Sequence, residues 1–349
     1  MKKSTRRALC LALLAALVFS VPALTQAASA PAKTVTLGIL QFAEHPSLDD
    51  CRNGFIEGMK QGGYVEGTNL IVNYQNAQAD MATDNAIATN FIGSTDIICA
   101  IATPSAQAAF NAAQGNTPVI FTAVSDPIAA QLANADGTAI AGITGVSDAL
   151  PVDAQLQLIR TMLPNAKKIG ILYSTSEVNS ESQLTTIKAA APNYGFEISA
   201  SGVTSSAEIQ AACDALFPTV DCVMNITDNL VVSSLPVLLD KAAQLKIPVF
   251  GSEVQQVKSG CLASAGINYF NLGIQAGLMA AQVLSGTDIK TIPFEIVKQN
   301  DLFINQNAAN ALGIAVSPDL ASKAIMIVDG EVQTTAVTSG TTTTAAAGK

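Results

Sequence analysis

Short apolar runs alternate along the chain with longer segments in which apolar residues recur every three or four positions. The short runs predict strands, and the longer segments predict helices with one buried face. In the first half the expected strands are 35–40, 70–74, 96–101 and 119–121, and the expected helices are 46–62, 81–92 and 104–113. In the second half the expected strands are 169–173, 196–202, 221–226 and 248–250, and the expected helices are 180–194, 207–217 and 230–245.

The strands predict the class of sheet. Because most of them are apolar throughout, they are typical of parallel sheets that are covered by helices on both faces. Alternating strands and helices build such a sheet through right-handed crossovers. The sequence therefore predicts an α/β protein.

An internal repeat divides the chain into two halves. The block 96–105 with 117–121 resembles the block 221–229 with 247–250, and 37–40 resembles 169–172 in the same order. About 320 residues after the N-terminal segment also exceed what one hydrophobic core comfortably holds. We therefore expect two Rossmann-like lobes.

The segment after the second half should return to the first lobe. A strand at 261–267 crosses over, a helix at 269–284 follows, a second crossing runs over 293–298, and a helix lies at 305–313. This order predicts lobes of 34–147 plus 270–295 and of 150–267 plus 301–329, joined by a three-strand hinge. The Thr-rich tail, 330–349, cannot bury a core and is predicted to be disordered.

The first 30 residues read as an export signal. Lys2, Lys3, Arg6 and Arg7 precede the uncharged apolar run 8–21, and Ala28-Ser29-Ala30 fits an A-x-A cleavage site. A membrane anchor is the lower-ranked alternative. Cys10 lies at the start of the apolar run rather than after it, so lipid attachment is not expected. These features predict a soluble periplasmic protein.

Charge and cysteine usage exclude several classes. After the leader the chain holds 14 basic against 27 acidic residues, a formal charge of −13, so no nucleic-acid partner is expected. Five cysteines remain, without a C-x-x-C pair, and we favour buried thiols over a disulfide framework. His45 is the only histidine, and its place before Pro46 suggests a turn residue. No metal or cofactor is expected.

Ligands of open parallel sheets bind beyond the carboxyl ends of the strands. The loops at those ends are rich in hydroxyl, amide and acidic side chains. The candidate ligand-binding residues are Gln41, Phe42, Glu44, Thr103, Pro104, Ser105, Ser125, Asp126, Ser176, Glu177, Asn179, Ser180, Thr227, Asp228, Asn229, Gly251, Ser252 and Glu253.

Two of these loops suggest opposite charges on the ligand. Thr103-Pro104-Ser105 is a helix start whose free N–H groups suit an anion such as a carboxylate, although Thr103 could equally cap its own helix. Asp228 is the first candidate for an ammonium group and Asp126 the second, each with a helix-start or solvated acid as the alternative. Because no nucleophile–base pair or nucleotide-binding motif occurs, an enzyme is not expected.

Several segments together resemble one family. They are 44–49, 63–67, 74–78, 100–108, 124–127 and 227–229. The resemblance is to ABC-transporter substrate-binding proteins of the type I periplasmic-binding-protein fold, of the kind associated with tryptophan and tyrosine uptake, and it runs from about 34 to 329. It implies a clamshell in which Thr103, Ser105, Ser125, Asp126, Asn179, Ser180, Thr227 and Asp228 face a cleft that closes by hinge motion.

The resemblance also implies partners. An amino acid, aromatic ones included, is the suggested small-molecule ligand, and an ABC permease with its ATPase would receive it from a monomeric binding protein. Sugars or nucleosides are the rival ligands. A receptor that presents its ligand to a membrane sensor is the rival function, and a DNA-binding regulator is disfavoured by the leader and the acidic charge.

The leader yields the first testable prediction. We expect the mature protein to begin near Ser29 or Pro31, because cleavage follows small residues after the apolar run. N-terminal sequencing of the exported protein checks this. An intact Met1 or a lipid on Cys10 would contradict it.

Overall fold

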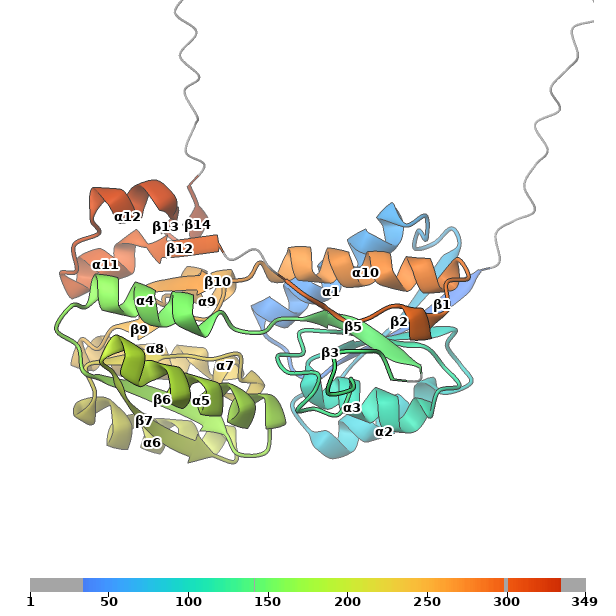
Figure 1. Cartoon of the computed structure of the whole chain (residues 1–349), viewed down its shortest axis with the longest axis horizontal. Helices are drawn as coiled ribbons and strands as arrows, with labels where there is room; N and C mark the ends of the chain where they lie inside the picture. The colour runs from blue at the N-terminus through green and yellow to red at the C-terminus, as the bar shows by residue number, and fades with distance from the viewer. Residues whose placement is uncertain (1–33, 141, 298–300, 334–349) are drawn as a thin grey trace, which may run out of the picture. The chain divides into compact units, whose positions relative to one another are not determined.

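The computed structural model describes residues 34–140, 142–297 and 301–333. The predicted signal peptide and most of the Thr-rich tail lie outside these ranges. Within them the chain builds two sheets, each covered by helices (Figure 1). We call each sheet with its covering helices a lobe.

The first lobe is built on a parallel sheet in the order β11-β5-β4-β3-β1-β2. Its strands are β1 (Val35–Gln41), β2 (Leu70–Asn76), β3 (Ile97–Ile101), β4 (Val119–Thr122), β5 (Ile143–Ser147) and β11 (Glu295–Ile296). Its helices are α1 (Pro46–Gln61), α2 (Met81–Phe91), α3 (Thr103–Ala113) and α10 (Tyr269–Leu284).

The second lobe has the sheet order β14-β13-β12-β10-β9-β8-β6-β7. Its strands are β6 (Lys168–Ser174), β7 (Glu197–Val203), β8 (Cys222–Met224), β9 (Val249–Phe250), β10 (Ala263–Gly266), β12 (Asp301–Asn305), β13 (Ile325–Val328) and β14 (Glu331–Val332). Its helices are α4 (Val152–Met162), α5 (Val178–Ala190), α6 (Ile209–Leu216), α7 (Asn229–Ser233), α8 (Leu235–Leu245), α9 (Val254–Lys258), α11 (Gln306–Leu312) and α12 (Pro318–Lys323).

The predicted repeat and fold class are confirmed. The orders β2-β1-β3-β4-β5 and β7-β6-β8-β9-β10 are equivalent, so α3 and α7 begin at matching points of the two lobes. The chain passes between the sheets after β5, after β10 and after β11. The second sheet also contains two antiparallel pairs, β10 with β12 and β13 with β14, which the sequence did not predict. The exact lobe boundaries stay a prediction.

Apolar side chains fill both faces of each sheet. In β1, Leu37 and Ile39 belong to the core cluster under α1 and α10, whereas Leu40 packs with Ala88 and Phe91 of α2 on the opposite face. This alternation explains why the strand is apolar throughout. The five cysteines of the described residues are free and buried, as the sequence suggested.

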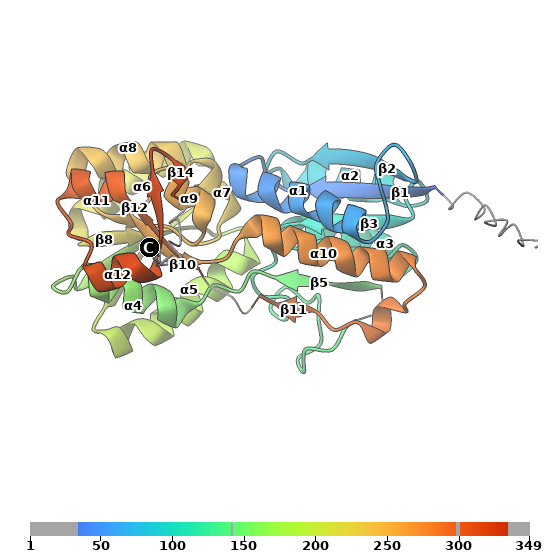
Figure 2. The ribbon, with the colours of Figure 1, turned by 90° about the horizontal axis from the view of Figure 1, so that it is seen from above.

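Helices α1 and α10 lie side by side and approach each other more closely than ordinary helices can (Figure 2). The contact is lined by four glycines, Gly54 and Gly58 on α1 and Gly273 and Gly277 on α10. A Cβ atom on Gly277 would lie 2.2 Å from the carbonyl oxygen of Phe55. Because that neighbour is backbone, it cannot rotate away, and the helix separation depends on glycine.

The second prediction tests this helix contact. Gly277→Ala should lower the free energy of unfolding by roughly 2 kcal/mol or more, because overpacking separates α1 from α10. In an exposed helix the same change would stabilise by about 1 kcal/mol. Denaturant unfolding followed by circular dichroism measures the difference. Leu278→Ala, at a residue 37% exposed on the same helix, is the control and should change little. Equal stability of Gly277→Ala and the parent would contradict the close contact.

Candidate ligand-binding site

The strand ends of the first lobe carry unusual backbone. Gln78, Ala79, Ala102 and Ala123 all have positive φ without being glycine, and they follow β2, β3 and β4. Ala102, with φ 84° and ψ 157°, occupies a region that is essentially restricted to glycine. Such residues cost about 1–3 kcal/mol each and cluster at functional sites. The carboxyl edge of this sheet is therefore a candidate functional edge.

A small cavity of about 10 Å³ lies at this edge, with room for about one water molecule. It is lined by side chains from both lobes. They are His45, Ser47, Leu48, Ala123, Asp148, Thr227, Asp228, Asn229, Val232, Glu253, Gln256 and Tyr269. No lysine or arginine is among them, so the lining is acidic.

Three buried carboxyl groups line the cavity, and burial shifts each of them. Loss of hydration raises the pKa of Glu253 to about 7 and raises the pKa of Asp148 and of Asp228. Glu177 lies close behind Asp228, and its pKa is raised first by burial and then by the charge of Asp228. The cavity is thus a place where net negative charge is costly and a cationic group is favoured.

The hydrogen bonds of these acids differ. Asp228 accepts from the Val231 amide (2.8 Å) and the Ser180 hydroxyl (2.6 Å), among others, and caps α7. Glu253 accepts from the Ser47 hydroxyl and caps α9. Asp148 accepts from the Tyr269 hydroxyl at Oδ2, and the nearby Ser125 side chain also lowers its pKa, but its Oδ1 makes no hydrogen bond of normal geometry among the described residues. Asp148 therefore retains the most capacity to bind a further donor.

Direct hydrogen bonds join the two lobes near the cavity. Between α1 and the start of α9, the Ser47 hydroxyl donates to Glu253 (2.9 Å), and the Gln255 amide donates to Asp50. Elsewhere, Ser125 and Thr227 share a hydrogen bond of 2.9 Å, and the Ser182 hydroxyl donates to Asp126. The lobes are therefore closed on each other, and a ligand larger than water requires them to separate.

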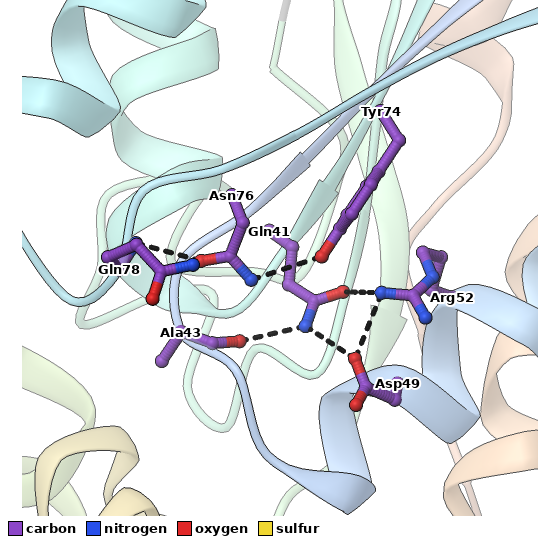
Figure 3. A network of polar contacts seen from close by, with 7 residues as sticks. All are labelled: Gln41, Ala43, Asp49, Arg52, Tyr74, Asn76 and Gln78. Carbon is purple, nitrogen blue, oxygen red and sulfur yellow. Dashed lines mark hydrogen bonds and ion pairs between the residues drawn. The ribbon is translucent and has the colours of Figure 1, made fainter.

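A polar network holds the start of α1 against β1 and β2 (Figure 3). The Gln41 amide donates to Asp49, and Arg52 donates to both Gln41 (3.1 Å) and Asp49 (2.9 Å). The Arg52 guanidinium also lies over the Tyr74 ring, 4.5 Å from its centroid, and the Tyr74 hydroxyl accepts from Asn76. This network fixes the orientation of the segment at the start of α1, from which His45 and Ser47 line the cavity.

Comparison with known proteins identifies the family. A family model for ABC transporter substrate binding proteins matches residues 36–328. The chain belongs to this family. The tyrosine-binding protein of Clostridioides difficile (strain R20291) is 41% identical over 281 residues, which cover 80% of this chain and 81% of that protein. Proteins of this family bind small molecules for a membrane transporter, a role that is not enzymatic, and they act outside the cytoplasm.

Two solved structures are similar over most of their length. The ABC domain in complex with L-Trp from Streptococcus pneumonia is 32% identical, with a TM-score of 0.81, and the match covers 85% of this chain and all of that one. The ligand-free, open structure of a substrate binding protein with adhesive properties from Clostridium difficile is 38% identical, with a TM-score of 0.65 and coverage of 84% and 99%. More distant solute-binding proteins share the fold. The open structure has the lower TM-score of the two although it is the more similar in sequence, which agrees with a closed lobe arrangement in this chain.

The cavity includes four of the residues singled out from the sequence, namely Thr227, Asp228, Asn229 and Glu253. The others lie around it. Phe42 is in the core, and Glu44 and Ser176 are exposed. Gln41 belongs to the network at the start of α1. At the start of α3 lie the buried residues Thr103, Pro104 and Ser105, and Ser105 donates to Asp84. The hydrogen bonds between the lobes include Ser125 and Asp126. Glu177, Asn179 and Ser180 support the 227–229 loop, the Gly251 carbonyl accepts from Gln155, and Ser252 bonds to Gln256. Their part in ligand binding stays a prediction.

Sequence reasoning missed eight lining residues. His45 and Ala123 lie in loops that follow predicted strands, and Asp148 follows β5, which was not among the expected strands. The position rule covered these loops, but His45 was interpreted as a turn residue and none of the three was chosen as a ligand-binding candidate. Ser47, Leu48 and Val232 face inward from helices, as Gln256 and Tyr269 also do. No local pattern distinguishes these from core or surface positions. No helix of the described ranges is long and apolar enough to span a bilayer.

The third prediction follows from Glu253. Its pKa rises from an ordinary 4.5 to about 7 in the folded chain. Between these two pH values, the carboxyl group is protonated in the folded state and ionised in the unfolded state. Stability should therefore fall as pH rises through this window, by about 3 kcal/mol from this group. Glu253→Gln cannot ionise and should flatten the dependence.

Chemical denaturation of parent and variant between pH 5 and 8 measures this effect. His45, with a pKa lowered to about 4 by burial, acts in the opposite direction below about pH 6.5. Both proteins keep His45, so the difference between their pH profiles isolates Glu253. Parallel profiles would show that Glu253 ionises at its ordinary pH.

Proposed function

We propose that this protein captures an amino acid, with an aromatic amino acid as the preferred ligand, and delivers it to an ABC importer. The observation that carries the proposal is the closed, carboxylate-lined cavity between the lobes. Two relatives support the ligand class: one is named a tyrosine-binding protein and one was solved with L-Trp.

The charge of the cavity favours an amino group over a sugar hydroxyl. Three carboxyl groups line it, and no basic side chain offsets them. A buried carboxylate is strongly stabilised by a charged hydrogen-bond donor, because the partner replaces lost hydration. An ammonium group supplies both the charge and three donors. Sugars supply hydroxyl donors only and leave the charge uncompensated.

Asp148 is our candidate for the ammonium partner. It is 2% exposed and lines the cavity, and its Oδ1 makes no hydrogen bond of normal geometry among the described residues. Asp228, the first candidate from the sequence, already accepts hydrogen bonds at both oxygens and caps α7, so it contributes to the fold as well. In this proposal Asp228 adds negative potential from the second lobe as the lobes close.

The remaining steps follow from the family role. The lobes part at the three hinge passages, admit the ligand and close on it, since a ligand shifts such an equilibrium only through contacts to the closed state. The proposal includes export by the cleaved N-terminal signal, a soluble periplasmic monomer, and delivery to a membrane permease with its ATPase.

The fourth prediction tests the amino-group site. Asp148→Asn should weaken binding of the best amino acid among L-tyrosine, L-tryptophan and L-phenylalanine by about 30-fold or more. Removing one partner of a buried charged pair typically costs about 2–5 kcal/mol, at 1.4 kcal/mol per decade of affinity. Calorimetry on both proteins measures the ratio.

Asp319→Asn, at an exposed acid of α12, is the matched control and should bind as the parent does. Melting temperatures confirm that the variants fold. A parent that binds sugars or nucleosides but none of the three amino acids would refute the proposed ligand class. Unchanged amino-acid affinity in Asp148→Asn would refute the role of Asp148 alone.

A further inference from the structure

His45 is a buried side chain whose chemistry the proposed function has not yet used. It precedes α1 and lines the cavity, and it is 7% exposed. Neither ring nitrogen makes a hydrogen bond of normal geometry within the described residues. Burial also lowers its pKa to about 4, against the smaller opposing effects of a hydrogen-bonding contact with the Asn229 side chain and of the Asp49 charge, so the ring is neutral and carries one N–H.

The other donor groups that line the cavity each make at least one hydrogen bond. Each of the five side chains with an N–H or O–H group donates to, or shares a hydrogen bond with, a protein acceptor. They are Ser47 with Glu253, Thr227 with Gln183, Asn229 with Glu177, Gln256 with Ser252, and Tyr269 with Asp148. His45 is thus the lining side chain whose donor group makes no hydrogen bond of normal geometry, whereas the Asn229 and Gln256 amides each make one and keep a second N–H.

Two unpartnered groups of opposite kind therefore share one cavity. Asp148 Oδ1 accepts, and the His45 ring donates. Leaving a buried polar group unpaired costs about 1–3 kcal/mol, so a molecule that pairs both groups recovers that free energy on binding. An α-amino acid carries its ammonium and its carboxylate on the same carbon, so one ligand offers a partner to each group.

We propose that His45 donates a hydrogen bond to the ligand's carboxylate and so selects α-amino acids over amines. This inference rests on the proposed function, and it assigns the second end of the zwitterion. Both ends then bind the first lobe, since His45 follows β1 and Asp148 follows β5. The second lobe closes over a ligand that is already oriented.

The fifth prediction uses L-tyrosine and tyramine, which share the ring and ammonium and differ in the carboxylate. His45→Leu should weaken L-tyrosine binding at least tenfold and tyramine binding by less than threefold. His45→Gln, which keeps a donor, should recover a substantial part of the L-tyrosine affinity. His45→Leu should melt no lower than the parent, because it removes two unpaired buried nitrogens.

His45 is the only histidine of the chain, so its ring is a unique spectroscopic reporter. In a tag-free protein labelled with ¹⁵N-histidine, saturating L-tyrosine should shift the ring nitrogen signals, and tyramine should shift them less. Equal effects of the two ligands on the signals, or equal loss of both ligands in His45→Leu, would overturn the role of His45.

The remaining outcomes are also decisive. If neither the parent nor His45→Leu binds tyramine measurably, the comparison of His45→Gln with His45→Leu is decisive. An equal loss of L-tyrosine affinity in these two variants refutes a donor role for His45. A large drop in melting temperature in His45→Leu would indicate a structural role instead. If the parent binds no α-amino acid, the proposed function fails together with this inference, whereas the results above overturn this inference alone.

Discussion

The close packing of α1 on α10 is the constraint on which the site depends. Four glycines let the two helix backbones meet, and this contact places the starts of both helices at the same edge of the sheet. The start of α1 carries His45 and Ser47, and the start of α10 carries Tyr269, which donates to Asp148. A wider helix separation would move both sets of cavity residues at once.

The buried carboxyl groups of the cavity lower the stability of the closed protein. Burial without a basic partner raises the pKa of each lining carboxyl group, and the hydrogen bonds from helix starts and hydroxyls only partly offset lost hydration. The strained backbone at Ala102 and Ala123 adds to this cost at the same edge. A binding protein gains from this arrangement, because a cationic group entering the cavity relieves free energy that the closed protein alone cannot.

The fold was predictable because its determinants are local or repeated. The apolar runs of 35–40 and 169–173 identified the first strand of each lobe, and the matched blocks predicted two similar lobes, which share a strand order in the structure. Strands β12 to β14, which form two antiparallel pairs with β10 and within the β13–β14 hairpin, were not predicted, since they are short and their pairing partners lie far away or across a turn. Of the candidate site, the position rule found the 227–229 loop and Glu253, and the family resemblance pointed to the same lobe contact.

The sequence by itself determined the elements, the two-lobe α/β fold and the sheet edge at which we propose that a ligand binds, because hydrophobic period and strand direction are properties of consecutive residues. Only the tertiary structure decided which polar groups at that edge are already satisfied. Asp228 is occupied by donors from β6 and α5, whereas Asp148 meets Tyr269, 121 residues away, and keeps one oxygen unpaired. Hydrogen-bond pairing depends on distance in space, and no spacing along the chain encodes it.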